Sequence, residues 1–312
     1  MILHHSPNAF GDLAELTVEW LGLPAEAVRR DYMIVMALKN LASSTYASTC
    51  VFKGGTSLSK CYPNTIERFS EDIDLTFVSD EVLSNKAYDK HLKKIEGIIA
   101  GGFNWEKIPA ERSQRNKSSF MWLAHASERI KLEIGSTIRP EPTSRRPIKT
   151  YIQEFLESHN DEDAITKFQL TKIELPVLAI TRTFVDKLFA VKRHALIGSL
   201  SQKSRHIYDV VKLYDHHEIR QLLADKKALK DLVQLTKQSD SVYLQKRTMP
   251  NEYQPDSPYN FLSWRESFDT RLVRNAYERL HRDLLYTDEP QPFHAAVETF
   301  EKLSNCFEAI GE

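Results

Sequence analysis

The pattern of apolar residues changes character along this chain, and the change limits the folds open to it. Before about residue 176, short runs of β-forming residues alternate with segments of helical period, whereas every periodic segment after that point is helical. The chain has 312 residues, of which 41% are hydrophobic and 27% charged, as is typical of a globular protein with room for two domains. We therefore predict an α/β (α+β) domain over 1–165 and a helical domain over 166–312.

Within the first domain we expect helices and short strands separated by glycine and proline residues. The expected helices are 11–45 and 82–100, and the expected strands are 50–52, the second half of 68–78, 118–125 and 128–137. The stretch that contains Pro140, Pro142 and Pro147 is expected to be a loop. In the second domain the expected helices are 180–197, 204–217, 217–238, 264–286 and 291–309, with a loop at 247–260.

The overall charge excludes a protein that coats nucleic acid, because 42 basic residues are offset by 43 acidic ones. The balance is uneven locally: residues 112–149 hold nine basic and three acidic side chains, a net charge of +6. Such a segment indicates either a surface for nucleic acid or an ordinary solvated face. Three scattered cysteines, no signal peptide and no long apolar run favour a cytoplasmic protein without a membrane span.

Two aspartates on one expected strand are the first candidates for chemistry. Asp72 and Asp74 are two positions apart, so their side chains share one face of the strand. Neighbouring carboxylates repel each other unless a cation lies between them, and magnesium prefers oxygen ligands together with substrate phosphates. The pair alone does not distinguish a metal site from two exposed aspartates.

A glycine turn and a third acidic residue add to this pattern. Gly54, Gly55, Thr56 and Ser57 stand where an expected strand gives way to a helix, a place where backbone N–H groups can hold a phosphate. An ordinary helix N-cap remains the alternative. Glu133 lies among apolar residues of an alternating strand, which favours either a third metal ligand or an exposed edge-strand glutamate.

These motifs resemble a known family. The segments FKGGTSLSKCY and RFSEDIDLTF resemble the AbiEii/AbiGii-type nucleotidyltransferase toxins of type IV toxin–antitoxin systems, which are related to the mycobacterial MenT toxins. The likeness extends to RRDYMIVMAL, IKLEIGS, FVDKLFAVKRHA and KSRHIYDVVKLY, and so spans roughly 20–215. The resemblance implies a DNA polymerase β-type nucleotidyltransferase fold with a small mixed sheet, followed by a helical C-terminal region.

The resemblance also implies roles for single residues. Asp72 and Asp74 would bind Mg²⁺, with Mn²⁺ as an alternative, and Glu133 would be the third acidic ligand. The residues expected to contact the nucleoside triphosphate (NTP) are Gly54, Gly55, Thr56 and Ser57. Lys187 and Asp209 would be catalytic, with Lys187 also binding the triphosphate; a solvated lysine and a surface acid are the alternatives.

Two further positions bear on the resemblance. His206 stands where the family often has an aspartate, so the first acid of that motif is absent. Ser70 lies two residues before Asp72, where relatives carry a serine or threonine whose phosphorylation silences the toxin. Ser70 is therefore expected to be regulatory, and an unmodified hydroxyl at the strand entry is the alternative.

The function implied by the resemblance is transfer of a nucleoside monophosphate from an NTP to an RNA acceptor. The expected acceptor is the 3′ end of a tRNA, and the expected outcome is a block of translation and growth in a toxin–antitoxin or phage-defence system. A cognate antitoxin, either a kinase or a transcriptional regulator, would be the protein partner. The alternatives are nucleotidylation of a protein, phosphoryl transfer, and a non-catalytic protein that binds nucleotide or antitoxin.

Overall fold

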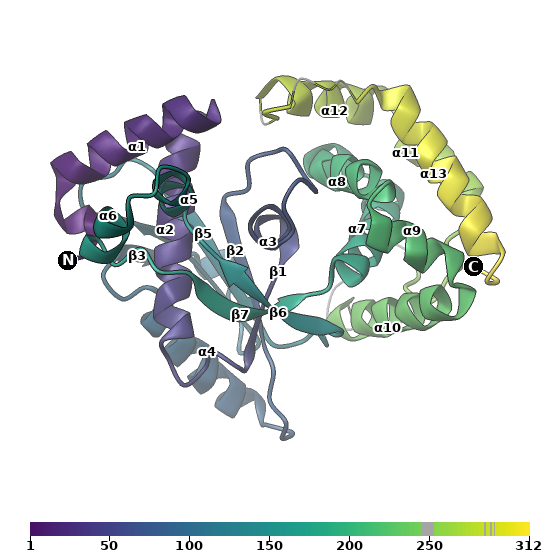
Figure 1. The fold of residues 1–312 in the computed structure, drawn as a ribbon. Coiled ribbons are helices and arrows are strands. Elements are labelled where there is room, and N and C mark those ends of the chain that lie inside the picture. The colour runs from purple at the N-terminus through teal and green to yellow at the C-terminus, as the bar shows by residue number, and fades with distance from the viewer. Residues whose placement is uncertain (245–252, 284, 288, 290) are drawn as a thin grey trace. The chain divides into compact units, whose positions relative to one another are not determined.

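The computed structural model describes residues 1–244, 253–283, 285–287, 289 and 291–312. The chain forms two compact units, each described by itself below (Figure 1). The sheet unit consists of Met1–Cys61, Ser70–Ser136 and Thr143–Leu178, and the helical unit consists of Tyr62–Phe69, Thr137–Pro142 and Ala179–Glu312.

The sheet unit holds seven strands and six α-helices among its described residues. Its strands are β1 Cys50–Lys53, β2 Asp72–Phe77, β3 Asn104–Lys107, β4 Asn116–Trp122, β5 Ile130–Gly135, β6 Thr143–Ile148 and β7 Ile173–Leu178. Its α-helices are α1 Pro7–Leu21, α2 Ala25–Ala42, α3 Gly54–Cys61, α4 Asn85–Ile99, α5 Tyr151–Ser158 and α6 Glu162–Lys167, and its 3₁₀ turns are η1 Leu3–His5 and η2 Pro109–Glu111.

The seven strands form one mixed sheet in the order β3-β4-β5-β2-β1-β7-β6. Neighbours pair antiparallel except for β2 with β5 and β1 with β7, which are parallel. In β2 and β5, fully buried apolar residues such as Ile73 and Leu132 alternate with half-buried polar ones. The apolar face packs against α2 and α4, whereas α3 lies on the opposite side next to β1 and β2 (Figure 1). The polar residues of β2 and β5 therefore share the face that carries α3.

The helical unit is built around α7, most of whose residues are buried. Its elements are α7 Ile180–Leu196, η3 Leu200–Lys203, α8 Ser204–Tyr214, α9 His217–Ala224, α10 Lys226–Leu244, η4 Phe261–Ser263, α11 Arg265–Phe268, α12 Arg271–Asp283 and α13 Phe293–Glu308. An aromatic cluster of Phe261, Trp264, Phe268 and Phe300 forms a second part of its core. No described helix has both the length and the apolarity that a membrane crossing requires.

The predicted fold class is confirmed, since a mixed sheet with covering helices precedes a helical region. Several elements differ from expectation. The helix expected over 11–45 is broken by Gly22, which has a φ of +67° and ends α1. The segments 217–238 and 264–286 each contain two helices instead of one. Part of the loop expected at 247–260 lies outside the described residues.

The loop expected around Pro140, Pro142 and Pro147 is a wrong prediction in part, because β6 lies within it. β6 is an edge strand, and proline is tolerated at a sheet edge, where no ladder hydrogen bond is needed on the outer side. β3 and β7 were not expected either. Because β7 completes the sheet, the sheet unit extends to Leu178, beyond the predicted boundary between 165 and 166.

Candidate active site

The acidic candidates of the sheet unit come together on one face. Asp72 and Asp74 are half-buried residues of β2 that flank the fully buried Ile73. Glu133 of β5 is the register partner of Asp74 across a parallel strand pair. Register partners in adjacent strands point to the same side of a sheet, so the three carboxylates share one face. They form an acidic face of the sheet.

Gly54, the first residue of α3, is in direct contact with this face. A Cβ atom built on Gly54 would lie 2.3 Å from Oδ2 of Asp74, much closer than van der Waals contact. Gly54 also has a φ of +84°, a conformation that residues with a side chain rarely adopt. Glycine at position 54 therefore allows the beginning of α3 to touch the Asp74 carboxylate.

The hydroxyl groups at the start of α3 are engaged within the protein. The buried Thr56 hydroxyl donates to the Asp72 carbonyl oxygen at 2.5 Å and lies 2.8 Å from the Ser70 hydroxyl. The Ser57 hydroxyl donates to the carbonyl of Gly54 at 2.9 Å. The Thr56 contacts attach α3 to the entry of β2, whereas the Ser57 bond lies within the first turn of α3. The backbone N–H groups of the first helical turn have no partner within their own helix and are of the kind that can bind an anion.

The other end of α3 is anchored by a buried ion pair. Lys60 Nζ lies 2.6 Å from Oδ1 of Asp31 in α2, and only 3% and 4% of their side chains are exposed. Asp31 also accepts the backbone N–H of Tyr151 at 2.7 Å, and Lys60 lies over the Tyr151 ring. Burial raises the pKa of Asp31, although Lys60 opposes the shift. The pair fixes α3 against α2 and α5.

A lysine shares the acidic face with the carboxylates. Lys131 Nζ lies 2.6 Å from Glu133 and 2.7 Å from Glu111, and its register partner on β2 is Asp72. Burial disfavours the charge of Lys131, but Glu111 and Glu133 outweigh it and raise the pKa. Among the described residues, no three His, Cys, Asp or Glu side chains are gathered closely enough to hold a metal ion. The carboxylate oxygens of Asp72 and Asp74 are ligands that suit a hard cation. Glu133, in contrast, is paired with Lys131.

The two remaining catalytic candidates meet in the helical unit. Lys187 of α7 lies 2.7 Å from Oδ2 of Asp209 in α8. Arg68 binds the same carboxylate through Nε at 2.6 Å and Nη2 at 2.7 Å. The Asp209 side chain is fully buried, with 0% exposed, and the Arg68 side chain is 4% exposed. Both alternatives given by the sequence, a solvated lysine and a surface acid, are therefore wrong for this pair.

The charge of this triad limits what Asp209 can do. Burial alone would raise the pKa of Asp209, but the charges of Arg68 and Lys187 outweigh it and hold the pKa well below its usual range. A carboxylate with both oxygens paired and a depressed pKa is a poor proton acceptor near neutral pH. Asp209 is thus suited to orient Lys187 rather than to act as a general base.

His206, which replaces the family's aspartate, lies beside the triad. It is half-buried by surface area, and desolvation followed by the charge of Lys187 lowers its pKa well below the usual value, which favours the neutral ring. Its Nδ1 atom has no hydrogen-bond partner among the described residues. The ring stacks at 6.3 Å on His194. His206 therefore supplies no negative charge in place of the missing acid.

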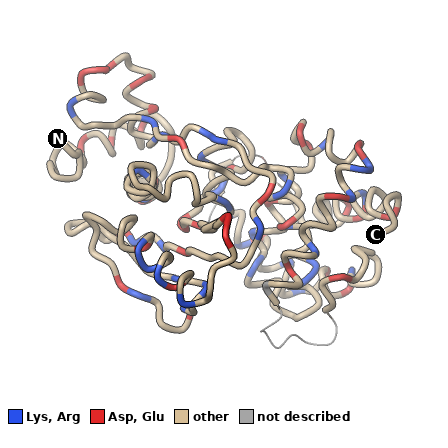
Figure 2. The backbone as a smooth tube through the Cα atoms, turned by 90° about the horizontal axis from the view of Figure 1, so that it is seen from below, with Lys and Arg blue, Asp and Glu red and all other residues tan. Residues whose placement is uncertain are grey.

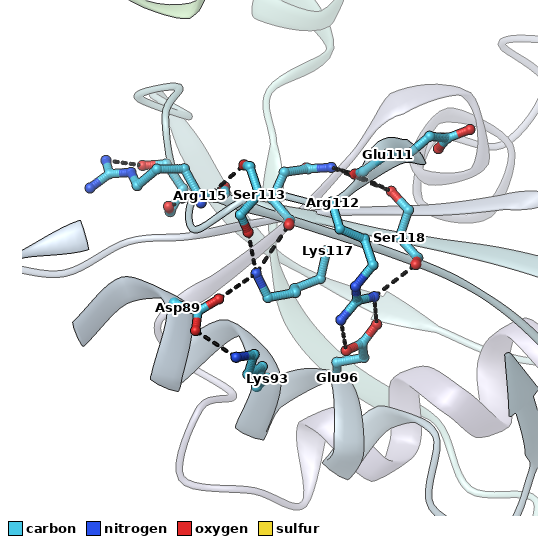
Figure 3. A network of polar contacts seen from close by, with 11 residues as sticks. Asp89, Lys93, Glu96, Glu111, Arg112, Ser113, Arg115, Lys117 and Ser118 are labelled. Atoms are coloured by element: carbon cyan, nitrogen blue, oxygen red, sulfur yellow. Dashed lines mark hydrogen bonds and ion pairs between the residues drawn. The ribbon is translucent and has the colours of Figure 1, made fainter. Parts of the chain in front are cut away.

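The basic segment 112–149 is largely neutralised by acids outside it. Arg112 binds Glu96 through two hydrogen bonds of 2.6 and 2.7 Å, and Lys117 lies 2.8 Å from Asp89, as Figure 3 shows. Lys149 pairs with Glu157 at 2.6 Å in the same way. Figure 2 shows basic and acidic positions interspersed along the backbone. Part of the net +6 of this segment is therefore offset by acids that lie outside it.

Sequence reasoning missed two residues of these sites. Arg68 stands in the RFSEDIDLTF segment, four residues before Asp72, and only its position in that segment could have drawn attention to it. In the sequence, Lys131 is one of the nine basic residues of segment 112–149. Its spacing of two from Glu133 on an alternating strand was the available signal, since it places both side chains on one face.

Comparisons with known proteins identify the family and a similar fold. The family described as nucleotidyl transferase AbiEii toxin, type IV TA system, matches residues 37–300. The fold is similar to that of MenT4, a nucleotidyltransferase toxin from Mycobacterium tuberculosis H37Rv, with a TM-score of 0.51 and 20% identity over 95% of this chain and 98% of that one. JHP933 from Helicobacter pylori aligns with a TM-score of 0.40 and 18% identity over 83% and 95% of the two chains. No curated protein sequence matches. Since the family match covers most of its length, the chain belongs to the AbiEii family of nucleotidyltransferase toxins of type IV toxin–antitoxin systems.

Proposed function

We propose that this toxin transfers a nucleoside monophosphate from an NTP to the 3′ end of a tRNA in the cytoplasm and thereby blocks translation and growth. The nucleotidyltransferase activity and the antitoxin partner follow from the family. The observation that carries the chemistry is the contact of Asp74 with Gly54, which places a carboxylate pair at the N-terminus of α3. The RNA acceptor rests on the family resemblance of the sequence.

In this proposal, the residues of the sheet unit bind the cation and the triphosphate. Asp72 and Asp74 would hold Mg²⁺, or Mn²⁺, with Glu133 as the third ligand. When bound, the cation stabilises the charge on the attacking and leaving oxygens. The backbone N–H groups at Gly54 and Gly55 would hold the triphosphate. The acceptor hydroxyl oxygen bonds to the α-phosphorus, the bond to pyrophosphate breaks, and the hydroxyl proton passes to water.

The roles of Lys187 and Asp209 are proposed from the resemblance. Lys187 is the proposed cation for the triphosphate charge; Asp209 orients it through their ion pair, and Arg68 holds Asp209 in place. Asp209 is accordingly a positioning residue.

A labelling experiment tests this proposal. The protein is incubated with Mg²⁺, each α-labelled NTP in turn and total RNA, beside Asp72→Ala and the exposed control Asp80→Ala. We expect label in a tRNA band with the wild type and with Asp80→Ala, and at least about a thousandfold less with Asp72→Ala. Label found only in protein would favour protein nucleotidylation, and no label with any NTP would favour a non-catalytic protein. Either result would overturn the proposal.

Ser70 is the proposed regulatory position, modified if the antitoxin is a kinase rather than a transcriptional regulator. Its hydroxyl lies 2.8 Å from that of Thr56, which itself donates to Asp72. A negative charge here would repel both the triphosphate and the Asp72 carboxylate. We therefore expect Ser70→Glu to lower the transfer rate at least about tenfold, and Ser70→Ala to stay within about threefold of wild type. Equal activity of the two variants in the tRNA-labelling assay would contradict this role.

A further inference from the structure

We propose that Lys131 is a built-in counter-ion of the acidic face, which competes with a divalent cation for Glu133 and so sets the affinity of the site for that cation. The inference rests on the proposed function, in which Asp72, Asp74 and Glu133 form the cation site. It adds a residue that neither the family match nor the sequence motif assigns to metal binding.

The position of Lys131 follows from the strand register. Lys131 and Glu133 are two residues apart on β5, so both side chains lie on the half-buried face of the strand. Lys131 is the register partner of Asp72, just as Glu133 is the register partner of Asp74. The four side chains thus form a quadrilateral on one face of the sheet, with Asp72 and Asp74 on β2 and Lys131 and Glu133 on β5. Lys131 occupies the fourth position, where its positive charge balances part of the charge of the three carboxylates.

The contacts of Lys131 hold its ammonium group at this corner. Nζ lies 2.6 Å from Oε1 of Glu133 and 2.7 Å from Oε2 of Glu111, and 22% of the side chain is exposed. Glu111 ends the short η2 turn, and its carbonyl oxygen accepts a hydrogen bond of 2.7 Å from Asn116 of β4. Two carboxylates from different elements thus clamp one lysine, a more ordered arrangement than a single exposed ion pair.

This clamp has a consequence for cation binding. A divalent cation that uses Glu133 as a ligand must either displace the ammonium group or share the carboxylate with it, because Oε1 of Glu133 is already paired with Lys131 at 2.6 Å. The positive charge of Lys131 also repels any cation bound at its register partner Asp72. Removing the charge while keeping the length of the side chain should remove both effects. The site would then bind a divalent cation more tightly.

The experiment measures Mn²⁺ binding to the full chain by electron paramagnetic resonance, without NTP or RNA. We expect Lys131→Met to lower the Kd for Mn²⁺ about tenfold or more. The matched control is Lys90→Met, which removes an equal charge from an exposed position of α4 and should leave the Kd unchanged. Lys131→Arg keeps the counter-ion and should bind Mn²⁺ as the wild type does. If Lys131→Met does not fold, Lys131→Gln takes its place.

A double variant identifies the carboxylate involved. Combining Lys131→Met with Glu133→Gln should return the Kd to within about threefold of the wild-type value. A Kd unchanged in Lys131→Met and Lys131→Gln, or a gain that Glu133→Gln does not diminish, would overturn the inference. Failure of the proposed function gives a different result: Asp74→Asn would then bind Mn²⁺ as the wild type does, whatever residue occupies position 131.

Discussion

Replacing Gly54 with alanine is expected to lower the rate of nucleotide transfer by about a hundredfold or more. The new Cβ would lie 2.3 Å from Oδ2 of Asp74, so either the carboxylate or the start of α3 must move. The backbone φ of +84° adds strain for any residue with a side chain. Both movements disturb the groups that we assign to the cation and to the triphosphate. The measurement is kcat/KM for labelled NTP at saturating RNA.

Gly97→Ala is the matched control, and it should leave the rate of transfer unchanged. Gly97 lies inside α4, and a Cβ atom there would meet nothing within 4 Å. Alanine is the better helix former, so we expect stability to rise by about 0.5–1 kcal/mol with no change in transfer. Wild-type activity in Gly54→Ala, with Gly97→Ala also active, would contradict the contact between α3 and Asp74 as the basis of the site.

The elements that sequence reasoning predicted are those whose period is visible locally. β5 alternates buried and half-buried residues along its whole length, and α7 repeats buried residues at helical spacing. β3 has no such pattern, because all four of its residues are exposed at the sheet edge. β6, likewise at an edge, combines exposed residues with Pro147. An edge strand is decided by its pairing partner more than by its own sequence.

In the candidate site, too, residues that belong to a local motif were predictable, and contacts between distant segments were not. The spacing of Asp72 and Asp74 and the motif resemblance were sufficient to name both of them and the pair of Lys187 and Asp209. Arg68 was not predictable from spacing, because its partner Asp209 is 141 positions away. Similarly, the requirement for glycine at position 54 depends on where the Asp74 carboxylate lies in space. Contacts between distant segments leave no period in the sequence.

Contacts between distant segments also change the charge that segment 112–149 presents. Counted along the chain, the segment is strongly basic, yet Glu96 and Asp89 of α4 neutralise Arg112 and Lys117. Both acids lie before residue 112, so a count within the segment omits them. Net charge over a window therefore overstates the surface potential wherever the window folds against acidic helices. The net charge of this segment is consequently weak support for an RNA acceptor.

Asp209→Asn is expected to cost about 3–5 kcal/mol in the free energy of unfolding. The change removes the buried carboxylate that Arg68 and Lys187 share, since Asp209 accepts from both and is itself fully buried. The measurement is urea unfolding at pH 7, combined with hydrogen exchange of peptides from α7 and α8. Asp215→Asn, in the same unit, removes an aspartate that is 77% exposed in its pair with Arg220 and should cost at most about 1 kcal/mol.

The pH dependence of this difference separates a charge effect from a packing effect. The pKa of Asp209 in the folded protein is depressed below its ordinary value of 3.8, because Arg68 and Lys187 outweigh its burial. A depressed pKa gives stability that is complete above about pH 4 and is lost as the pH falls through the folded-state pKa. The wild type should therefore lose its advantage over Asp209→Asn progressively below that pH. A difference that stays constant between pH 7 and pH 3 would mean that the Asp209 charge does not stabilise the triad.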